Sequence, residues 1–158
     1  MIQIAKDLVT EILKTYCKTQ QIFYEEKDFE RIKINPTAIV LAGKEQLREN
    51  RRKVGKWTDP VSGKHYVRSQ TYERIQPVEV NLFHRTETDV DEILQALLNN
   101  LPKGIDDGMG NWVPIEPATI DWPPDQKERS LGVLIIRFIG GIYKDTELGK
   151  FTQLYVQS

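Results

Sequence analysis

The chain has 158 residues, of which 39% are hydrophobic and 28% charged, and its formal net charge at pH 7 is −1. This length and apolar content suit one hydrophobic core, so we expect a single α+β domain over residues 1–158. The balance of charges excludes wholesale disorder and a uniformly basic nucleic-acid binder, so any electrostatic signal must be local.

The sequence predicts neither a signal peptide nor a membrane anchor. No apolar run reaches the roughly 18–20 residues that cross a bilayer, and residues 1–16 carry four charged side chains. Cys17 is the only cysteine, which excludes an internal disulfide and is typical of a chain that folds in a reducing cytoplasm.

The first predicted elements lie before residue 44. Apolar residues at helical spacing predict an amphipathic helix over residues 2–19, whose apolar stripe should cover a sheet. Residues 20–36 form a connector with room for one short strand. The compact apolar run 37–42, between Pro36 and Gly43, predicts a buried strand.

Residues 44–76 are predicted to form a protruding two-stranded hairpin, which we call the arm. Its apolar content is low, and the Pro, Ser and Gly residues within 58–63 favour a chain reversal. The returning strand continues into residues 78–82, where apolar and polar residues alternate, so this part should lie on the core sheet.

The second half of the chain predicts one helix and three strands. A capping sequence that starts at Thr86 and a helical stripe that ends before Pro102 predict a helix. Strands are predicted at 112–120 and, in the centre of the sheet, at 131–139, while residues 144–158 form a C-terminal tail or edge strand. The expected fold is a mostly antiparallel sheet packed against the N-terminal helix and this second, central helix.

The sequence contains no recognisable catalytic set, cofactor motif or metal site. His65, His84 and Cys17 lack any standard zinc spacing, and Cys17 has no identifiable base, so it is interpreted as a small buried residue. Four loop aspartates could serve acid/base chemistry or bind a hard cation, but turn formation and solvation are the favoured interpretation for Asp106, Asp107, Asp121 and Asp125. We therefore expect a protein that is not an enzyme and needs no cofactor.

The arm is the strongest electrostatic feature of the sequence. It carries a net charge of +5, so the rest of the chain carries −6. The residues predicted to form an interaction surface are Arg48, Arg51, Arg52, Lys53, Lys56, Trp57, Lys64 and Arg68.

Three interpretations of the arm compete. It is a solvated loop with incidental charge; or it binds nucleic acid, with cations on phosphates and Trp57, Tyr66 or Tyr72 stacked on bases; or it docks onto the acidic body of a neighbouring subunit. A head-to-tail contact of the third kind makes a ring when its rotation closes. Apolar support for a ring is expected from Trp57, Trp112, Trp122 and residues 151–156.

The order of the predicted elements at 2–16, 37–42, 78–82, 88–101 and 131–139 resembles that of the tail terminator proteins of tailed bacteriophages and related contractile injection particles. The resemblance covers residues 2–143 and rests on length and element order. It implies a structural virion protein, made in the cytoplasm of the bacterial host, that forms a hexameric ring on the finished tail tube and stops its polymerisation.

The same resemblance implies the partners. They are further copies of the chain, the tail tube protein and the neck or head connector protein, with possible DNA contact in the lumen and no membrane. Two alternatives stay open: another head-tail connector or head-completion protein, and a nucleic-acid-binding accessory protein that uses the basic arm.

Overall fold

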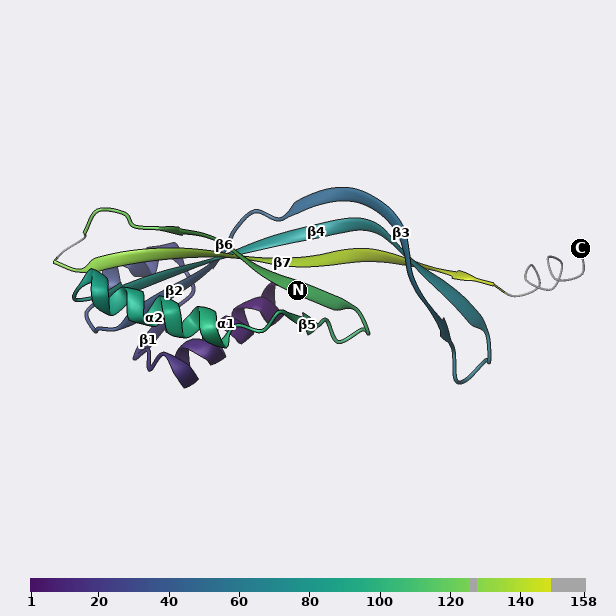
Figure 1. Ribbon diagram of the computed structural model, residues 1–158, viewed down its shortest axis with the longest axis horizontal. Coiled ribbons are helices and arrows are strands. Elements are labelled where there is room, and N and C mark those ends of the chain that lie inside the picture. Colours follow the sequence, from purple (N-terminus) through teal and green to yellow (C-terminus); the bar gives the residue numbers. More distant parts are fainter. Residues whose placement is uncertain (126–127, 149–158) are drawn as a thin grey trace, which may run out of the picture. The chain divides into compact units, whose positions relative to one another are not determined.

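The computed structural model describes residues 1–125 and 128–148, and these form an α+β fold with a mixed seven-stranded sheet and three helices (Figure 1). The predicted α+β class is confirmed. The helices are α1 (Ile2–Tyr16), the 3-10 helix η1 (Glu26–Arg31) and α2 (Glu87–Asn100). The strands are β1 (Gln21–Phe23), β2 (Thr37–Ala42), β3 (Gln46–Thr58), β4 (His65–His84), β5 (Gly104–Asp106), β6 (Trp112–Asp121) and β7 (Ser130–Glu147).

The strands follow the order β1-β2-β4-β7-β6-β5, and β3 pairs with β4. The β2–β4, β5–β6 and β6–β7 pairs are antiparallel, whereas β1 and β2 are parallel. Parallel neighbours need a crossover connection, and η1 lies in the segment that connects β1 to β2. The parallel pair therefore arises from the connector 20–36.

The chain comprises two compact units. Unit 1 contains Met1–Glu45 and Ile75–Gly140, and unit 2 contains Gln46–Arg74 and residues 141–158. The strands β4 and β7 are long enough to contribute residues to both units. The predicted arm 44–76 corresponds to the first segment of unit 2, but its second segment comes from β7, which runs well beyond the strand predicted at 131–139.

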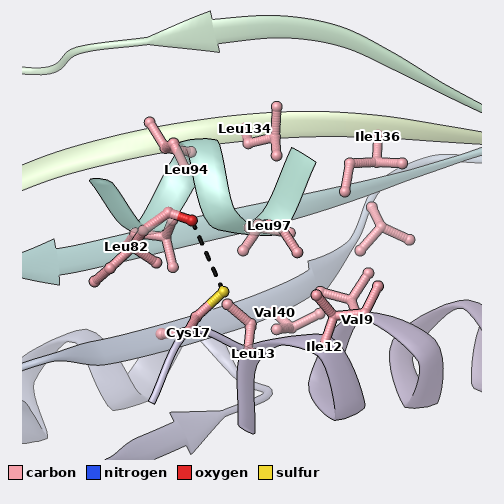
Figure 2. Close-up of a cluster of buried hydrophobic side chains, with 14 of the residues drawn as sticks. Val9, Ile12, Leu13, Cys17, Val40, Leu82, Leu94, Leu97, Leu134 and Ile136 are labelled. Carbon is pink, nitrogen blue, oxygen red and sulfur yellow. Dashed lines mark hydrogen bonds between the residues drawn. The ribbon is translucent and has the colours of Figure 1, made fainter. Parts of the chain in front are cut away.

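Unit 1 holds the hydrophobic core. The helices α1 and α2 lie side by side on one face of its sheet (Figure 1), and Figure 2 shows their apolar side chains facing those of the strands. Because the sheet supplies alternate residues to this face, the helices and strands form one continuous cluster. Its members include Val9, Ile12, Leu13, Leu94 and Leu97 from the helices, and Val40, Leu82, Leu134 and Ile136 from the strands.

The opposite face of this sheet is also apolar. Ile39, Phe83 and Val133 are buried there, and Phe29 of η1 meets Phe83 edge to face with ring centroids 5.6 Å apart. The residues of β7 that follow Ser130 therefore contact apolar side chains on both faces, which explains their continuous hydrophobic run. The predicted central position of this strand is confirmed, because β7 lies between β4 and β6.

The two long helices differ in how well the sequence predicts their ends. The Thr86 Oγ1 atom accepts a hydrogen bond of 3.1 Å from the Asp89 backbone N–H, so α2 begins at the predicted cap. The helix α1 stops at Tyr16, three residues before its predicted end, because Lys18 has a φ of +50°. This left-handed conformation cannot continue a helix, and lysine gives no sequence signal for it.

Unit 2 has almost no core. Its described residues contain β3, the first half of β4 and the last part of β7, and no helix. Among those residues only Val67 and Gln70 are buried, and twelve of the thirteen residues of β3 are exposed. Unit 2 is therefore a sheet that no second layer covers within the described part of the chain.

Candidate functional site

The turn of the arm is built by Asp59. Its carboxylate accepts hydrogen bonds from the Val61 backbone N–H at 2.9 Å and from the Ser62 hydroxyl at 2.8 Å, while Gly63 has a φ of +71°. These bonds, with the one from Val61 as the largest cause, lower the pKa of Asp59. The predicted reversal within 58–63 is therefore a hydrogen-bonded turn between β3 and β4.

A polar and aromatic cluster, which we call the cross-strand cluster, joins all three strands of unit 2. Trp57 of β3 stacks on Tyr66 of β4 with ring centroids 4.6 Å apart, and the guanidinium of Arg68 lies 5.9 Å from the Trp57 ring centroid. Arg68 also donates two hydrogen bonds, of 2.9 and 3.1 Å, to the carboxylate of Asp145 on β7. This bidentate pair links β4 to β7 within unit 2.

The cross-strand cluster lowers the pKa of Asp145, chiefly through the Arg68 hydrogen bonds and further through one from the Trp57 side chain. A lowered pKa in the folded state adds stability that is present above the ordinary aspartate pKa of about 3.9 and lost as the pH falls through the lowered value. We expect the substitution Arg68→Ala to raise the Asp145 pKa toward its ordinary range. A carbon-13 titration of the Asp145 carboxyl group measures this, and an unchanged pKa would contradict the contact.

Three further residues of the predicted surface also have partners within unit 2. Arg51 pairs with Glu49 at 2.9 Å, Arg52 donates a 2.9 Å hydrogen bond to Gln70, and Lys64 lies 3.8 Å from Glu147. These contacts are exposed or partly exposed, so each contributes at most about 1 kcal/mol. With Arg68 and Trp57 included, five of the eight residues of the predicted surface contact groups of their own chain.

The remaining three, Arg48, Lys53 and Lys56, are exposed on β3, and their side chains make no hydrogen bond or ion pair with the described residues. Besides Trp57, five exposed apolar side chains of unit 2 accompany them. These are Leu47, Val54, Val61, Tyr72 and Ile142. Unit 2 therefore presents unpaired cations beside apolar groups, the composition of a surface that contacts a partner.

The anionic partners in unit 2 are residues that the sequence interpretation missed. Asp145 and Glu147 follow the predicted central strand by several positions, and only the pairing of β4 with β7 brings them to Arg68 and Lys64. Residues 144–147 are Lys, Asp, Thr and Glu, all of them polar, so no alternation of apolar and polar residues could have extended the predicted strand to Asp145 and Glu147. Residues 151–156, predicted as apolar support for a ring, lie outside the described residues.

The two units carry opposite charges. Unit 2 contains ten Lys and Arg against five Asp and Glu, for a net charge of +5, whereas unit 1 contains twelve against eighteen, for −6. The net charges equal those from the sequence, because residues 141–158 contain two Lys and two acidic residues and so add no net charge to unit 2. The polarity seen along the sequence is therefore a polarity between two folded units.

The loop aspartates that could have served chemistry bond to nearby residues of the chain. Asp107 Oδ1 accepts from the backbone N–H groups of Met109 and Asn111 at 2.7 and 3.1 Å. Asp106 accepts from Gly108 and Asp125 from Ser130. Bonds of this kind form tight turns. Among residues 1–125 and 128–148, no group of three or more His, Cys, Asp or Glu is placed to hold a metal ion.

Unit 1 has an open pocket, which we call the α1–α2 pocket. It lies where the end of α1, Pro36, the end of β4 and the first half of α2 meet, and it contains both Cys17 and His84. The Cys17 thiol donates to the Ile93 carbonyl oxygen at 3.8 Å, shown by the dashed line in Figure 2, and burial raises its pKa. A raised pKa disfavours the thiolate that nucleophilic chemistry requires. Cys17 therefore serves as a packing residue here.

The predicted apolar contacts in unit 1 are on its surface. Trp112 is 61% exposed and its ring covers Gly104, where an added Cβ would lie only 2.4 Å from the indole. Trp122 is 38% exposed. Both tryptophans are accessible to a partner, and Trp112 is not a core residue.

None of the helices in the described residues is long and apolar enough to cross a membrane. In comparisons with known proteins, no family model matches the chain, and no curated protein matches its sequence.

Proposed function

We propose that this protein is a structural subunit that assembles with copies of itself into a ring through its basic arm. In this proposal the arm, most of which belongs to unit 2, protrudes from the body formed by unit 1 and docks on the acidic body of the next subunit. A contact between two different patches is heterologous, and it makes a ring when its rotation closes and an open filament when it does not. No chemical step is needed, because the action is steric and interfacial.

The observation that carries the proposal is the uncovered sheet of unit 2. A sheet normally buries at least one face against another layer, because isolated ribbons are marginally stable in water. Here the described residues of unit 2 bury two side chains and expose Leu47, Val54 and Tyr72. A neighbouring subunit would supply the missing layer.

The charges support a second copy of this chain as the neighbour. Unit 2 carries +5 and unit 1 carries −6, so two copies are complementary head to tail, whereas two arms would repel each other. The unpaired cations Arg48, Lys53 and Lys56 are the residues best placed to contact the acidic unit. The other charged residues of the surface hold unit 2 together.

Within this proposal, the ring caps the end of a phage or phage-like tail tube, stops its polymerisation and joins it to the neck. The support is the resemblance in the order of elements: the order α1, β2, the arm, β4, α2 and β7 resembles that of the tail terminator proteins. One face would complement the last tube ring, and the other would not accept a further tube subunit.

Nucleic-acid binding is the second candidate, and the same three unpaired cations favour it because they could contact phosphates. The aromatic residues favour it less. Trp57 and Tyr66 stack on each other, so their facing ring surfaces are not open to bases. Unit 1, with its −6 charge, would repel the same polyanion.

The test is the triple substitution Arg48→Glu, Lys53→Glu and Lys56→Glu. We expect the wild-type protein to have a multiple of its 18.3 kDa chain mass in light scattering and to show rings in negative-stain images, and the variant to be monomeric. The reason is that reversed charges would meet the acidic unit of the neighbour.

The matched control reverses three exposed cations of unit 1, Lys33, Arg85 and Lys103, and should leave the assembly intact. A wild-type monomer at all concentrations, or an unchanged mass of the triple variant, would overturn the proposal. Binding of DNA by a monomer, with an affinity that falls steeply as salt rises, would instead support the second candidate.

A further inference from the structure

The α1–α2 pocket combines an apolar floor with acidic groups. Its floor includes Cys17 and Ile93, which are buried, while Asp89 and Glu92 come from successive turns of α2. The exposed ring of Tyr16 also lines it. Residues three apart on a helix share a face, so both carboxylates belong to the same side of the pocket.

The electrostatics of the pocket favour a cation. Two carboxylates outweigh the one permanent cation of the lining, Lys18, and the C-terminal end of α1 adds its partial negative charge. The remaining titratable groups are His84 and the buried Cys17. His84 accepts a 2.8 Å hydrogen bond at Nδ1 from the Arg85 backbone N–H, and this nitrogen lies 3.7 Å from Asp89, so it does not neutralise that carboxylate by donating to it.

The lining suits a long basic side chain. Lysine and arginine place their aliphatic stems on apolar surface and their charged heads near carboxylates or water. An aromatic ring beside the site adds a cation–π contact. In the α1–α2 pocket, the stem would lie on Ile93 and Cys17, and the head would meet Asp89, Glu92 and the Tyr16 ring.

We propose that the α1–α2 pocket receives an arginine or lysine from strand β3 of a second copy of this chain. The inference rests on the proposed self-assembly and names the acceptor site on the acidic unit. The occupant follows from charge: unit 2 is the basic unit, and Arg48, Lys53 and Lys56 have no charged partner among the described residues of their own chain. A second copy therefore supplies a cation for the acidic pocket and an acidic partner for the unpaired cations of β3.

The first experiment uses the substitution Glu92→Lys, which places a cation in the pocket and pairs it with Asp89. Glutamate and lysine have similar helix propensities, and Glu92 lies beyond the first turn of α2, so the helix should persist. We expect subunit association to weaken by about 100-fold, as when a desolvated charge pair is lost. The substitution Glu30→Lys makes the same charge change on exposed η1 and should leave association unchanged.

The second experiment mixes two variants, each of which is expected not to assemble by itself. The Glu92→Lys variant keeps a working β3, and a variant that lacks the three β3 cations keeps a working pocket. For this mixture the β3 variant is Arg48→Ala, Lys53→Ala, Lys56→Ala, because glutamates at those positions could pair with the lysine introduced at position 92. One contact is therefore possible between the two variants, and it leaves no further working site. We expect mixing to give a dimer that grows no larger, which mass photometry measures directly.

The outcomes separate this inference from the proposed function. If the wild-type protein assembles and the Glu92→Lys variant assembles equally well, the pocket is not the acceptor although self-assembly stands. If both variants fail alone and no dimer forms on mixing, the pocket and β3 do not belong to one contact, and the inference is overturned. A wild-type monomer overturns the proposed function itself. If far-UV circular dichroism shows that Glu92→Lys misfolds, Glu92→Gln replaces it with the same expected direction.

Discussion

The substitution Gln76→Glu is expected to lower the free energy of unfolding at pH 7 by about 3–5 kcal/mol, the range for an uncompensated buried charge. Gln76 is fully buried, and its side-chain Nε2 atom donates hydrogen bonds to the carbonyl oxygens of Gly43 at 2.8 Å and Pro77 at 2.9 Å. A carboxylate would put negative oxygen against both carbonyl groups. Because whole domains are stable by only about 5–15 kcal/mol, the variant should be close to unfolding.

The pH dependence identifies the cause. Burial and the two carbonyl groups would raise the pKa of the introduced carboxyl group in the folded state above its unfolded value of about 4.3. The added destabilisation is then complete above the raised pKa and fades as the pH falls toward about 4.3, below which both states are protonated. Urea unfolding of the variant and the wild type between about pH 4 and pH 8 measures this difference.

Gln70 provides the matched control, since it is also buried but its Oε1 atom accepts a hydrogen bond of 2.9 Å from the Arg52 guanidinium. The substitution Gln70→Glu keeps an acceptor there and adds a favourable charge, so its cost at pH 7 should be much smaller. Equal losses for the two variants would show that burial alone, and not the direction of the hydrogen bond, decides the effect.

The substitution Leu97→Ala is expected to cost about 3 kcal/mol, because it removes a fully buried side chain from the core of unit 1. Leu97 projects from α2 into the cluster of apolar side chains shown in Figure 2. The lost transfer free energy and the cavity left behind both contribute. Urea unfolding followed by the helical circular dichroism signal reports on this unit, which contains both long helices.

Leu47→Ala makes the same chemical change where the side chain is 62% exposed, on β3. A surface substitution of this kind should change the free energy of unfolding of the isolated subunit by no more than about 0.5 kcal/mol. If both leucine substitutions cost the same, the core would not lie where the burial places it.

The sequence predicted the elements of unit 1 well, for a simple reason. The helical stripes and the runs 37–42 and 131–139 are apolar because their residues are buried, and burial leaves a local pattern. The cap at Thr86 is local as well. The end of α1 was predicted too late, because a positive φ at Lys18 depends on its surroundings.

The candidate surface was predicted only in part. The eight residues of the predicted surface are all in unit 2, but their separation into two groups was not visible in the sequence. Arg68 and Lys64 meet Asp145 and Glu147, more than seventy residues further along the chain. Arg48, Lys53 and Lys56 meet no such partner among the described residues. Pairing between distant strands has no local signature, so charge along the sequence could not separate them.

The sequence by itself determined the α+β class, the positions of the two long helices and the division of charge into a basic and an acidic part, because these follow from local periodicity and composition. Only the tertiary structure decided that β7 extends into unit 2, that no covering layer is present there among the described residues, and that the end of α1 and residues 89–96 of α2 form a pocket with Glu92 in its lining. Each of these depends on contacts between residues far apart in the chain, which form when buried area and hydrogen bonds across the whole fold are satisfied together.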